Sequence, residues 1–378
     1  MKDSKIDRIE WARLTGKRPR KAGCNSRLGE HGQQVSPPIA RITTDDGATG
    51  FGCSRITEDQ ALALVGFRLS EAFDSESGVT ERFRTLEYPI WDLAGQIAGK
   101  PVYALIGKQT DDDGVFRAPC YDTSLYIDDL HLTDDSEGAA LIAAEALEGV
   151  VRGHKAFKIK IGRGAMHMPL EEGTRRDILV IHAVREAVGS DAKILLDANN
   201  GYNLNLTKRV LGETADVRIY WMEEAFHEDS MLYANLKAWL NAAGLETRIA
   251  DGEGGASPRL LEWAAEGLID IVQYDIFHPG FSRWLELGPQ LDGWNVGSAP
   301  HHYGGHYGNY ASCHLAAAIQ RFEFVEWDDA ETPGLDDSEY SISDGCVNVS
   351  GLPGFGLKLD GEIYARAVKE NGFVVRET

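Results

Sequence analysis

Two lysines alternate with apolar residues in the segment Ala-Phe-Lys-Ile-Lys-Ile-Gly, residues 156–162. Successive side chains of a β-strand point to opposite faces, so Lys158 and Lys160 share one face. In a parallel barrel the apolar face packs on helices, and both lysines point into the barrel. The alternative is a solvated edge strand with the lysines outside. Inward ammonium groups need anionic partners or lowered pKa values, and a lysine with a lowered pKa is a candidate general base.

Acidic residues recur at the ends of four later apolar runs. They are Asp197 in Leu-Leu-Asp-Ala-Asn, Glu223 in Trp-Met-Glu-Glu-Ala, Glu253 in Ile-Ala-Asp-Gly-Glu and Asp275 in Val-Gln-Tyr-Asp-Ile. A single acid in such a place is commonly a helix N-cap or a solvated turn. Recurrence at successive strand ends favours a shared site, because active sites of parallel barrels are built there. Oxygen ligands from three strands suit a hard cation, with water and substrate oxygens completing an octahedron.

Four of the eleven histidines lie in residues 298–315, after the seventh predicted strand. His301, His302 and His306 could form a zinc site, since histidine clusters bind zinc. The alternative is a single catalytic histidine, His301, oriented by the Asp275 carboxylate of the neighbouring strand. We expect His314, in the following helix, to be structural.

The elements that position these residues follow a regular pattern from about residue 115 to 345. Short apolar runs cover residues 156–161, 194–198, 219–224, 247–249, 269–276, 294–296 and 322–326, and helical stretches such as residues 174–188 separate them. The spacing of roughly 25–35 residues is the size of a βα repeat and favours a parallel barrel.

The N-terminal region has a different pattern. Residues 5–55 predict short strands broken by a Lys/Arg/Gly-rich stretch, residues 17–32, which we expect to be a mobile loop. One helix is predicted over residues 57–73, opened by Thr57, and another within 84–107, ending near Gly99. We therefore expect an α+β capping domain over residues 1–115, a barrel over 116–345, and a C-terminal return to the capping domain over 346–378.

The bulk composition excludes several classes of protein. A formal net charge of −21 over 378 residues argues against a nucleic-acid or anionic-membrane surface, because both would be repelled. The first ten residues lack the apolar stretch of a signal peptide and no window is long enough to span a bilayer, so we expect a cytoplasmic protein. Five scattered cysteines without a Cys-x-x-Cys pair indicate neither a disulfide framework nor a zinc ribbon.

Taken in order along nearly the whole chain, these motifs resemble the mandelate racemase subgroup of the enolase superfamily. Residues 88–107, Tyr-Pro-Ile-Trp-Asp-Leu-Ala-Gly-Gln-Ile-Ala-Gly-Lys-Pro-Val-Tyr-Ala-Leu-Ile-Gly, look like the family's capping-domain helix. Residues 351–360, Gly-Leu-Pro-Gly-Phe-Gly-Leu-Lys-Leu-Asp, look like its C-terminal return. The resemblance implies an α/β fold, a (β/α)7β-type modified TIM barrel with an α+β capping domain.

The resemblance also implies a role for each residue of the site. Lys160 would be an acid/base on one face of the substrate, and Lys158 would neutralise the substrate carboxylate or tune Lys160. Asp197, Glu223 and Glu253 would bind Mg²⁺. His301, with Asp275 as its partner, would be the second acid/base, and Glu326 would hydrogen-bond the developing enolate. We expect the pKa of His301 to lie above its usual value because of Asp275, and that of Lys160 below it because of Lys158 and Mg²⁺.

Two departures from the family pattern leave ligands open. Ala225 stands where the family usually has proline after the Glu-Glu pair, which weakens the choice of Glu223 over Glu224. The fifth strand can be aligned through Glu253 or through Asp251, and we favour Glu253 because Gly252 stands directly before it.

Together these residues predict Mg²⁺-dependent removal of the proton next to a substrate carboxylate. We expect a lyase that dehydrates a sugar acid, an aldonate or aldarate, to a 2-keto-3-deoxy acid. A racemase or epimerase of a 2-hydroxy acid is the alternative, and a non-catalytic barrel scaffold is a third. The predicted partner is this small-molecule substrate, without nucleic acid or membrane, in a homo-oligomer. The predicted substrate-binding residues are Asn199, Arg18, Arg20 and Arg27, since arginine offers paired donors to a distal carboxylate, and the basic loop also contains His31.

Overall fold

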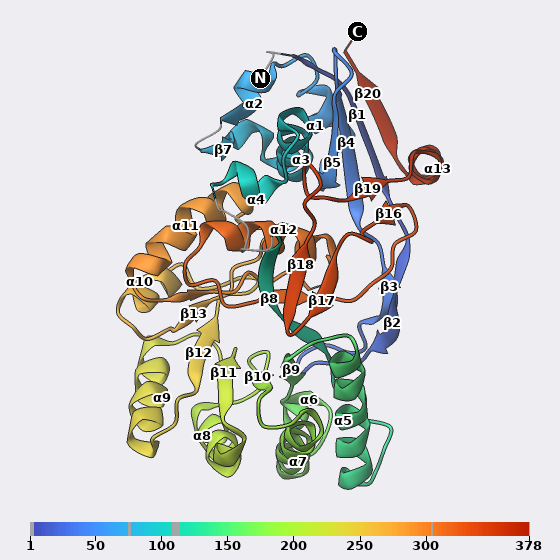
Figure 1. Ribbon diagram of the computed structural model, residues 1–378. Helices are drawn as coiled ribbons and strands as arrows, with labels where there is room; N and C mark the ends of the chain where they lie inside the picture. The colour runs from blue at the N-terminus through green and yellow to red at the C-terminus, as the bar shows by residue number, and fades with distance from the viewer. Residues whose placement is uncertain (1–3, 75–76, 108–113, 304, 378) are drawn as a thin grey trace.

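The computed structural model describes residues 4–74, 77–107, 114–303 and 305–377. A parallel barrel occupies the middle of the chain, and a smaller domain, built from both ends of the chain, sits against it (Figure 1). None of the helices in these ranges is long and apolar enough to cross a membrane.

Eight parallel strands form the barrel. They are β8 (Phe116–Leu125), β9 (Ala156–Lys160), β10 (Lys193–Asp197), β11 (Ile219–Glu223), β12 (Arg248–Asp251), β13 (Ile271–Val272), β14 (Gly297–Ser298) and β15 (Val325–Trp327). Each strand from β8 to β13 pairs with the next, and β15 pairs with β8. A parallel bridge between Ser298 and Phe322 joins β14 to the segment before β15 and closes the ring.

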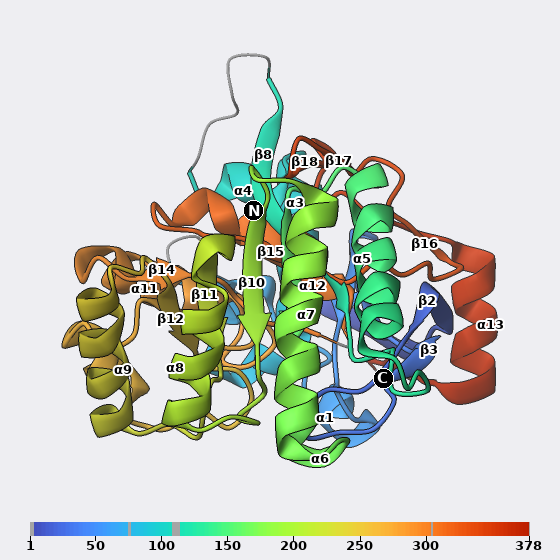
Figure 2. The same cartoon turned by 90° about the horizontal axis from the view of Figure 1, so that it is seen from below.

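Helices connect successive strands on the outside of the barrel, and Figure 2 shows α5, α7, α8 and α9 side by side there. They are α5 (Asp135–Val151), α6 (Arg163–Met166), α7 (Leu170–Val188), α8 (Leu204–Glu213), α9 (Ser230–Ala243), α10 (Leu260–Ala265), α11 (Phe281–Gly293) and α12 (Tyr307–Leu315), with short 3-10 turns at Ala215–Val217 and Ala316–Ala318. After β15 the chain forms β16 (Leu335–Asp336), a hairpin of β17 (Ser341–Ser343) and β18 (Cys346–Val349), and β19 (Lys358–Leu359). Strand β18 pairs antiparallel with β8, so the hairpin extends the barrel sheet before the chain returns to the capping domain. The predicted (β/α)7β barrel is confirmed.

The barrel interior is filled by a layer of side chains, one from or beside each strand. This layer consists of Tyr121, Ala156, Leu195, Trp221, Ala250, Ile271, Ala299 and Phe324, all buried. Because side chains alternate along a strand, the residues two positions further on point into the barrel again, nearer its carboxyl end.

The capping domain is an antiparallel sheet covered by helices. Its strands run in the order β20 (Phe373–Arg376), β1 (Ile6–Arg13), β4 (Pro38–Thr44) and β5 (Thr49–Cys53). The C-terminal helix α13 (Gly361–Asn371) precedes the edge strand β20, so the chain's last part returns to its first. A small hairpin of β6 (Phe73–Asp74) and β7 (Gly78–Val79) lies beside the helices.

Two predicted helices differ in detail. The helix expected over residues 57–73 is two short ones, α1 (Glu58–Leu62) and α2 (Leu69–Ala72), separated by a turn in which Gly66 has a φ of +83°. Thr57 caps α1 as expected. In the next segment a 3-10 turn (Glu81–Leu86) leads into α3 (Glu87–Ala98), which ends at Gly99, and α4 (Val102–Leu105) follows.

The basic stretch expected to be a mobile loop is an ordered arm docked on the barrel, so that expectation is wrong. It contains β2 (Gly16–Ala22), which pairs with β3 (Gly32–Val35). Its middle forms a backbone bridge between Cys24 and Ile127, and the buried Ser26 hydroxyl donates to the Ala198 carbonyl at 2.5 Å. Acids of the barrel domain neutralise two of the arm's basic residues, Arg18 and Arg20, and the arm's remaining lysines and arginine stay exposed.

Candidate active site

Functional side chains lie at the carboxyl ends of the barrel strands, two residues beyond the interior layer. Five of them each stand two positions after a residue of the interior layer in the chain. The pairs are Ala156 and Lys158, Leu195 and Asp197, Trp221 and Glu223, Ala299 and His301, and Phe324 and Glu326. The inward direction predicted for both lysines follows from this alternation, and both are buried.

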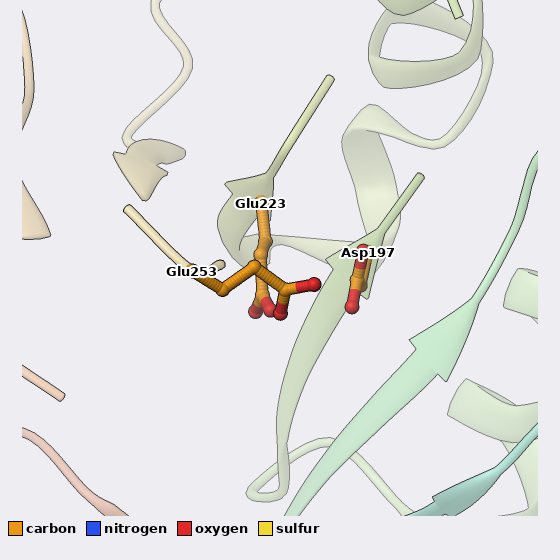
Figure 3. Close-up of side chains that lie close together, drawn as sticks. All are labelled: Asp197, Glu223 and Glu253. Atoms are coloured by element: carbon orange, nitrogen blue, oxygen red, sulfur yellow. The ribbon is translucent and has the colours of Figure 1, made fainter. Parts of the chain in front are cut away.

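Three carboxylates converge at this end of the barrel (Figure 3). Asp197, Glu223 and Glu253 each offer an oxygen, and these oxygens lie within 4.8 Å of one another. Within the part of the chain that the structure describes, this is the only such group of three or more potential metal ligands.

A glycine explains why Glu253 rather than Asp251 faces inward. Gly252 has a φ of +129°, a left-handed conformation that favours glycine, and it bends the chain after β12. Asp251 points outward, where its carboxylate accepts a hydrogen bond from the Tyr233 hydroxyl of α9 at 2.7 Å. Glu253, one residue beyond the bend, reaches the site.

Glu224, the other member of the Glu-Glu pair, is also held outside the carboxylate group. It has a φ of +41° and accepts hydrogen bonds from the amides of Asn199 at 3.0 Å and Asn200 at 2.6 Å. Burial and the charge of Glu253 raise its pKa to about 9.

The two lysines contact different acids. Lys158 Nζ lies 2.9 Å from Glu223 Oε1, 3.1 Å from Glu326 Oε1 and 3.6 Å from Asp197 Oδ2. Lys160 contacts Asp197 directly. Lys158 therefore links acids from three strands, while Lys160 stands one layer nearer the opening.

The downward pKa shift expected for Lys160 depends on Lys158 and Mg²⁺, and the charges of the protein alone shift the pKa in the opposite direction. Burial lowers the pKa, but the charge of Asp197, with smaller help from Glu253 and Glu223, outweighs burial and the repulsion of Lys158. The pKa of Lys160 therefore lies above its usual value. Since the Asp197 carboxylate holds it there, a group that engages Asp197 would bring it down.

His301 lies between two acids. Its Nδ1 is 2.6 Å from Asp275 Oδ1, and its Nε2 is 3.0 Å from Glu253 Oε2. Burial opposes the charged ring, but the charges of Glu253 and Glu326 and the hydrogen bond to Asp275 raise the pKa of His301 to about 10. The upward direction of the expected shift is confirmed, although Glu253 and Glu326 together contribute more to it than Asp275.

The other histidines have structural partners. The His302 backbone N–H donates to Glu326 Oε2 at 2.9 Å and its ring Nε2 contacts the Glu326 carbonyl. His306 pairs with the Thr332 hydroxyl, and His314 accepts the Tyr103 backbone N–H at 3.0 Å. The zinc alternative finds no support, because His301, His302 and His306 do not form a ligand group among the described residues.

Glu326 is buried and held by several donors. The Thr123 hydroxyl donates to its Oε1 at 2.8 Å, and Lys158 and the His302 backbone N–H complete its contacts. Burial opposes ionisation, but the charges of Lys158 and His301 hold the pKa of Glu326 well below its usual value. Glu326 is thus an acceptor fixed at the floor of the site.

The predicted substrate-binding residues divide into two groups. Asn199 lies at the site, where its backbone N–H donates to Asp197 at 2.8 Å and its side-chain amide to Glu253 at 3.4 Å. The buried Arg18 is instead engaged by Asp328 through two hydrogen bonds of 2.7 Å. Arg20 pairs with Glu145 and Glu148, and Arg27 is exposed and forms no ion pair among the described residues.

The electrostatics of the carboxylate group fit a divalent cation. Burial and the charge of Asp197 raise the pKa of Glu223 to about 8, because a buried carboxylate is destabilised by a like charge beside it. Oxygen donors in a buried group of this kind match the preference of Mg²⁺. The donor set therefore fits the metal that the sequence predicts.

A cavity of about 490 Å³ lies between the capping domain and this end of the barrel. The capping domain contributes Cys53, Arg55 and Tyr88 to its wall, and the barrel contributes Asp275 and Tyr303. A substrate entering the site from here would contact both domains.

Sequence reasoning missed two inward-facing residues of the site. Trp221 precedes Glu223 by two positions, and its indole Nε1–H donates to Glu223 Oε2 at 3.1 Å. Gln273 precedes Asp275 by two positions and is buried. Counting back by two from each acid would have found both.

Comparison with known proteins gives a consistent result. Residues 141–363 match the family model described as enolase C-terminal domain-like. A structure of galacturonate dehydratase from Geobacillus sp., complexed with D-galacturonate and 5-keto-4-deoxy-D-galacturonate, is 50% identical, with a TM-score of 0.95 and coverage of 99% of both chains.

Two further matches extend the comparison. A mandelate racemase/muconate lactonizing protein from Geobacillus sp. Y412MC10, complexed with magnesium/tartrate, is 49% identical with a TM-score of 0.97, covering 100% of this chain and 98% of that one. D-gluconate dehydratase of Thermoproteus tenax is 29% identical over 216 residues, which are 57% of this chain and 39% of that protein.

Proposed function

Because this chain belongs to the enolase C-terminal domain-like family, in the mandelate racemase subgroup of the enolase superfamily, we propose that it is a Mg²⁺-dependent sugar-acid dehydratase. The observation that carries the proposal is the ring of side chains around the three carboxylates. Lys160 comes from the second barrel strand and His301 follows the seventh, so that two acid/base groups flank one carboxylate group.

Asp197, Glu223 and Glu253 would hold the metal. Bound there, Mg²⁺ supplies positive charge beside the substrate carboxylate and stabilises the enolate that forms when the neighbouring proton leaves. Lys158 neutralises the substrate carboxylate, and the Glu326 carboxylate, 3.1 Å from Lys158, holds this ammonium group in place.

Lys160 and His301 divide the proton transfers. The Lys160 amine takes the proton from the carbon next to the carboxylate, and the C–H electron pair becomes the enolate double bond. As the enolate collapses, the bond to the hydroxyl on the next carbon breaks, and the His301 imidazolium gives that hydroxyl a proton so that it leaves as water. The enol that remains tautomerises to a keto acid, and no oxidant or reductant is needed.

The substrate class follows from the charges around the site and from the relatives. The galacturonate dehydratase that is 50% identical was crystallised with D-galacturonate, a uronic acid with one carboxylate and a neutral far end. In this chain Asp328 neutralises Arg18, which leaves that guanidinium unavailable to a second carboxylate. We therefore propose a uronate such as D-galacturonate as substrate, in preference to the aldonate or aldarate expected from the sequence.

A substrate screen tests this function. The protein with Mg²⁺ is incubated with D-galacturonate, with D-gluconate as an aldonate and with galactarate as an aldarate, and keto-acid formation is followed. The expected result is a keto-deoxy acid from galacturonate and loss of activity with EDTA. Inversion of the carbon next to the carboxylate without loss of water would instead assign a racemase or epimerase.

The assembly and the compartment stay predictions. A homo-oligomer is expected, and light scattering after size-exclusion chromatography measures its mass. A cytoplasmic location, without nucleic acid or membrane as partner, is likewise untested and is checked by fractionation of cells that express the protein.

A further inference from the structure

Gln273 is a buried amide without a hydrogen-bond partner. Its side chain is 1% exposed, and neither its Nε2 nor its Oε1 meets a donor or acceptor in the described part of the chain. A buried polar group left unbonded destabilises the folded protein, and an apolar side chain of similar size would avoid this penalty. Its place in the barrel therefore calls for a partner outside the chain.

The strand alternation directs this amide into the barrel. Ile271, two residues earlier, belongs to the interior layer, and Asp275, two residues later, reaches His301. The residue between them faces the same way.

Gln273 completes a layer that belongs to the candidate site. In parallel barrels, side chains at the same depth come from alternate strands, so the eight residues of the interior layer divide into two sets of four. Ala156, Trp221, Ile271 and Phe324 are the interior residues of the alternate strands β9, β11, β13 and β15. The next layer on these strands consists of Lys158, Glu223, Gln273 and Glu326.

Three members of this layer satisfy one another, and Gln273 does not join them. Lys158 contacts one oxygen each of Glu223 and Glu326, and the remaining oxygens accept from the Trp221 indole N–H and the His302 backbone N–H. The amide on the sixth strand thus lies in one layer with a candidate metal ligand, Glu223, and with Lys158 and Glu326 at the proposed carboxylate end of the substrate.

We propose that Gln273 is a further substrate-binding residue, whose amide binds the hydroxy-carboxylate end of the sugar acid. This rests on the function proposed above. The amide Nε2–H donates to a carboxylate oxygen, and Oε1 accepts from the adjacent hydroxyl. An amide suits this end of the substrate because it offers a donor and an acceptor without adding charge to a site already rich in acids.

Tartrate provides a probe that does not depend on turnover, since it is a hydroxy acid found with magnesium in the 49% identical relative. Calorimetry measures tartrate affinity in the Mg²⁺-loaded protein for wild type, Gln273→Leu and Gln273→Met. Exposed Gln290 on α11 supplies the control Gln290→Leu, which removes an amide away from the site.

Loss of a hydrogen bond to a charged group predicts a fall of about tenfold in tartrate affinity for both Gln273 variants. Their Mg²⁺ affinity without tartrate stays within twofold of wild type, and their unfolding midpoint is at or above that of wild type. Tartrate affinity within twofold of wild type in both variants would overturn the proposal. So would a parallel fall in Mg²⁺ affinity, which would mean that Gln273 acts through the metal site.

The tartrate-binding result can be distinguished from the result of the activity test for the proposed function. Wild-type protein that binds tartrate through Gln273 but yields no keto acid from any sugar acid would refute dehydration and leave the binding role intact.

Discussion

The indole N–H of Trp221 donates a hydrogen bond to Glu223 Oε2 at 3.1 Å, from two positions earlier on the same face of β11. Lys158 occupies the other oxygen of Glu223 at 2.9 Å. A ligand held from both sides is oriented before the metal arrives, and loss of such a partner typically weakens metal affinity by about 10- to 100-fold.

Trp221→Phe keeps most of the ring volume in the barrel interior and removes the donor. We expect Mg²⁺ affinity to fall by about tenfold, measured by calorimetry, because Glu223 loses one of its two fixed partners. Trp239→Phe, on the outer helix α9, serves as control. Equal Mg²⁺ affinity in the Trp221 variant and in wild type would show that Lys158 alone orients Glu223.

Substitutions of Asp251 and of Glu253 should have different effects, the first on the stability of the protein and the second on Mg²⁺ binding. Glu253→Gln removes one of three carboxylate ligands and is expected to abolish measurable Mg²⁺ binding while the barrel stays folded. Asp251→Ala removes the acceptor of the Tyr233 hydroxyl and should destabilise the protein by roughly 1–3 kcal/mol with Mg²⁺ affinity retained. The reverse pattern, measured by calorimetry and urea unfolding, would move the fifth-strand ligand to Asp251.

Arg18 is expected to stabilise the arm rather than to bind substrate. Arg18→Met leaves the buried Asp328 carboxylate unpaired, and removal of one partner of a buried ion pair costs about 3–5 kcal/mol. Adding Asp328→Asn should recover part of that loss, as urea unfolding of the single and double variants would measure. Unchanged stability together with a raised KM for the sugar acid would assign Arg18 to the substrate instead.

The buried Asp92 carboxyl, which is not part of the metal site, is expected to make the stability of the protein depend on pH. It accepts the backbone N–H groups of Phe51 at 3.1 Å and Phe355 at 2.9 Å, and burial raises its pKa to about 7. Folding raises the pKa of this carboxyl, so the folded protein binds the proton more tightly than the unfolded chain does. The resulting stabilisation is lost as the pH rises from the pKa of the unfolded state to that of the folded state.

The wild type should therefore lose stability relative to Asp92→Asn between pH 5 and pH 8, by about 2 kcal/mol, with the difference levelling off above the folded pKa. Urea unfolding of both proteins across this range gives the comparison. Parallel stability curves would show that the two backbone donors hold Asp92 ionised at its ordinary pKa.

Local alternation made much of the site predictable. The direction of Lys158 and Lys160 depends only on the period of two along β9, and the acids at the strand ends follow the same rule. The barrel was predictable for the same reason, since its strands recur at the spacing of a βα repeat.

The rest depended on contacts between residues distant in the chain. Arg18 meets Asp328 across 310 positions, so no pattern within residues 17–32 could reveal that the arm is neutralised and docked. The choice of Glu253 over Asp251 rested on the φ of Gly252, and the raised pKa of Lys160 on its contact with Asp197. A sequence gives residue types for such pairs but not their distances.

Proton NMR in D₂O, with Mg²⁺ and D-galacturonate, tests the central claim most directly by following wild type, Lys160→Ala and His301→Asn together. Wild type should form 5-keto-4-deoxy-D-galacturonate. Both variants should form none, and exchange of the proton next to the carboxylate should survive in at most one of them, the variant that keeps the abstracting base. Keto-acid formation at the wild-type rate by either variant would contradict a mechanism that divides proton transfer between Lys160 and His301.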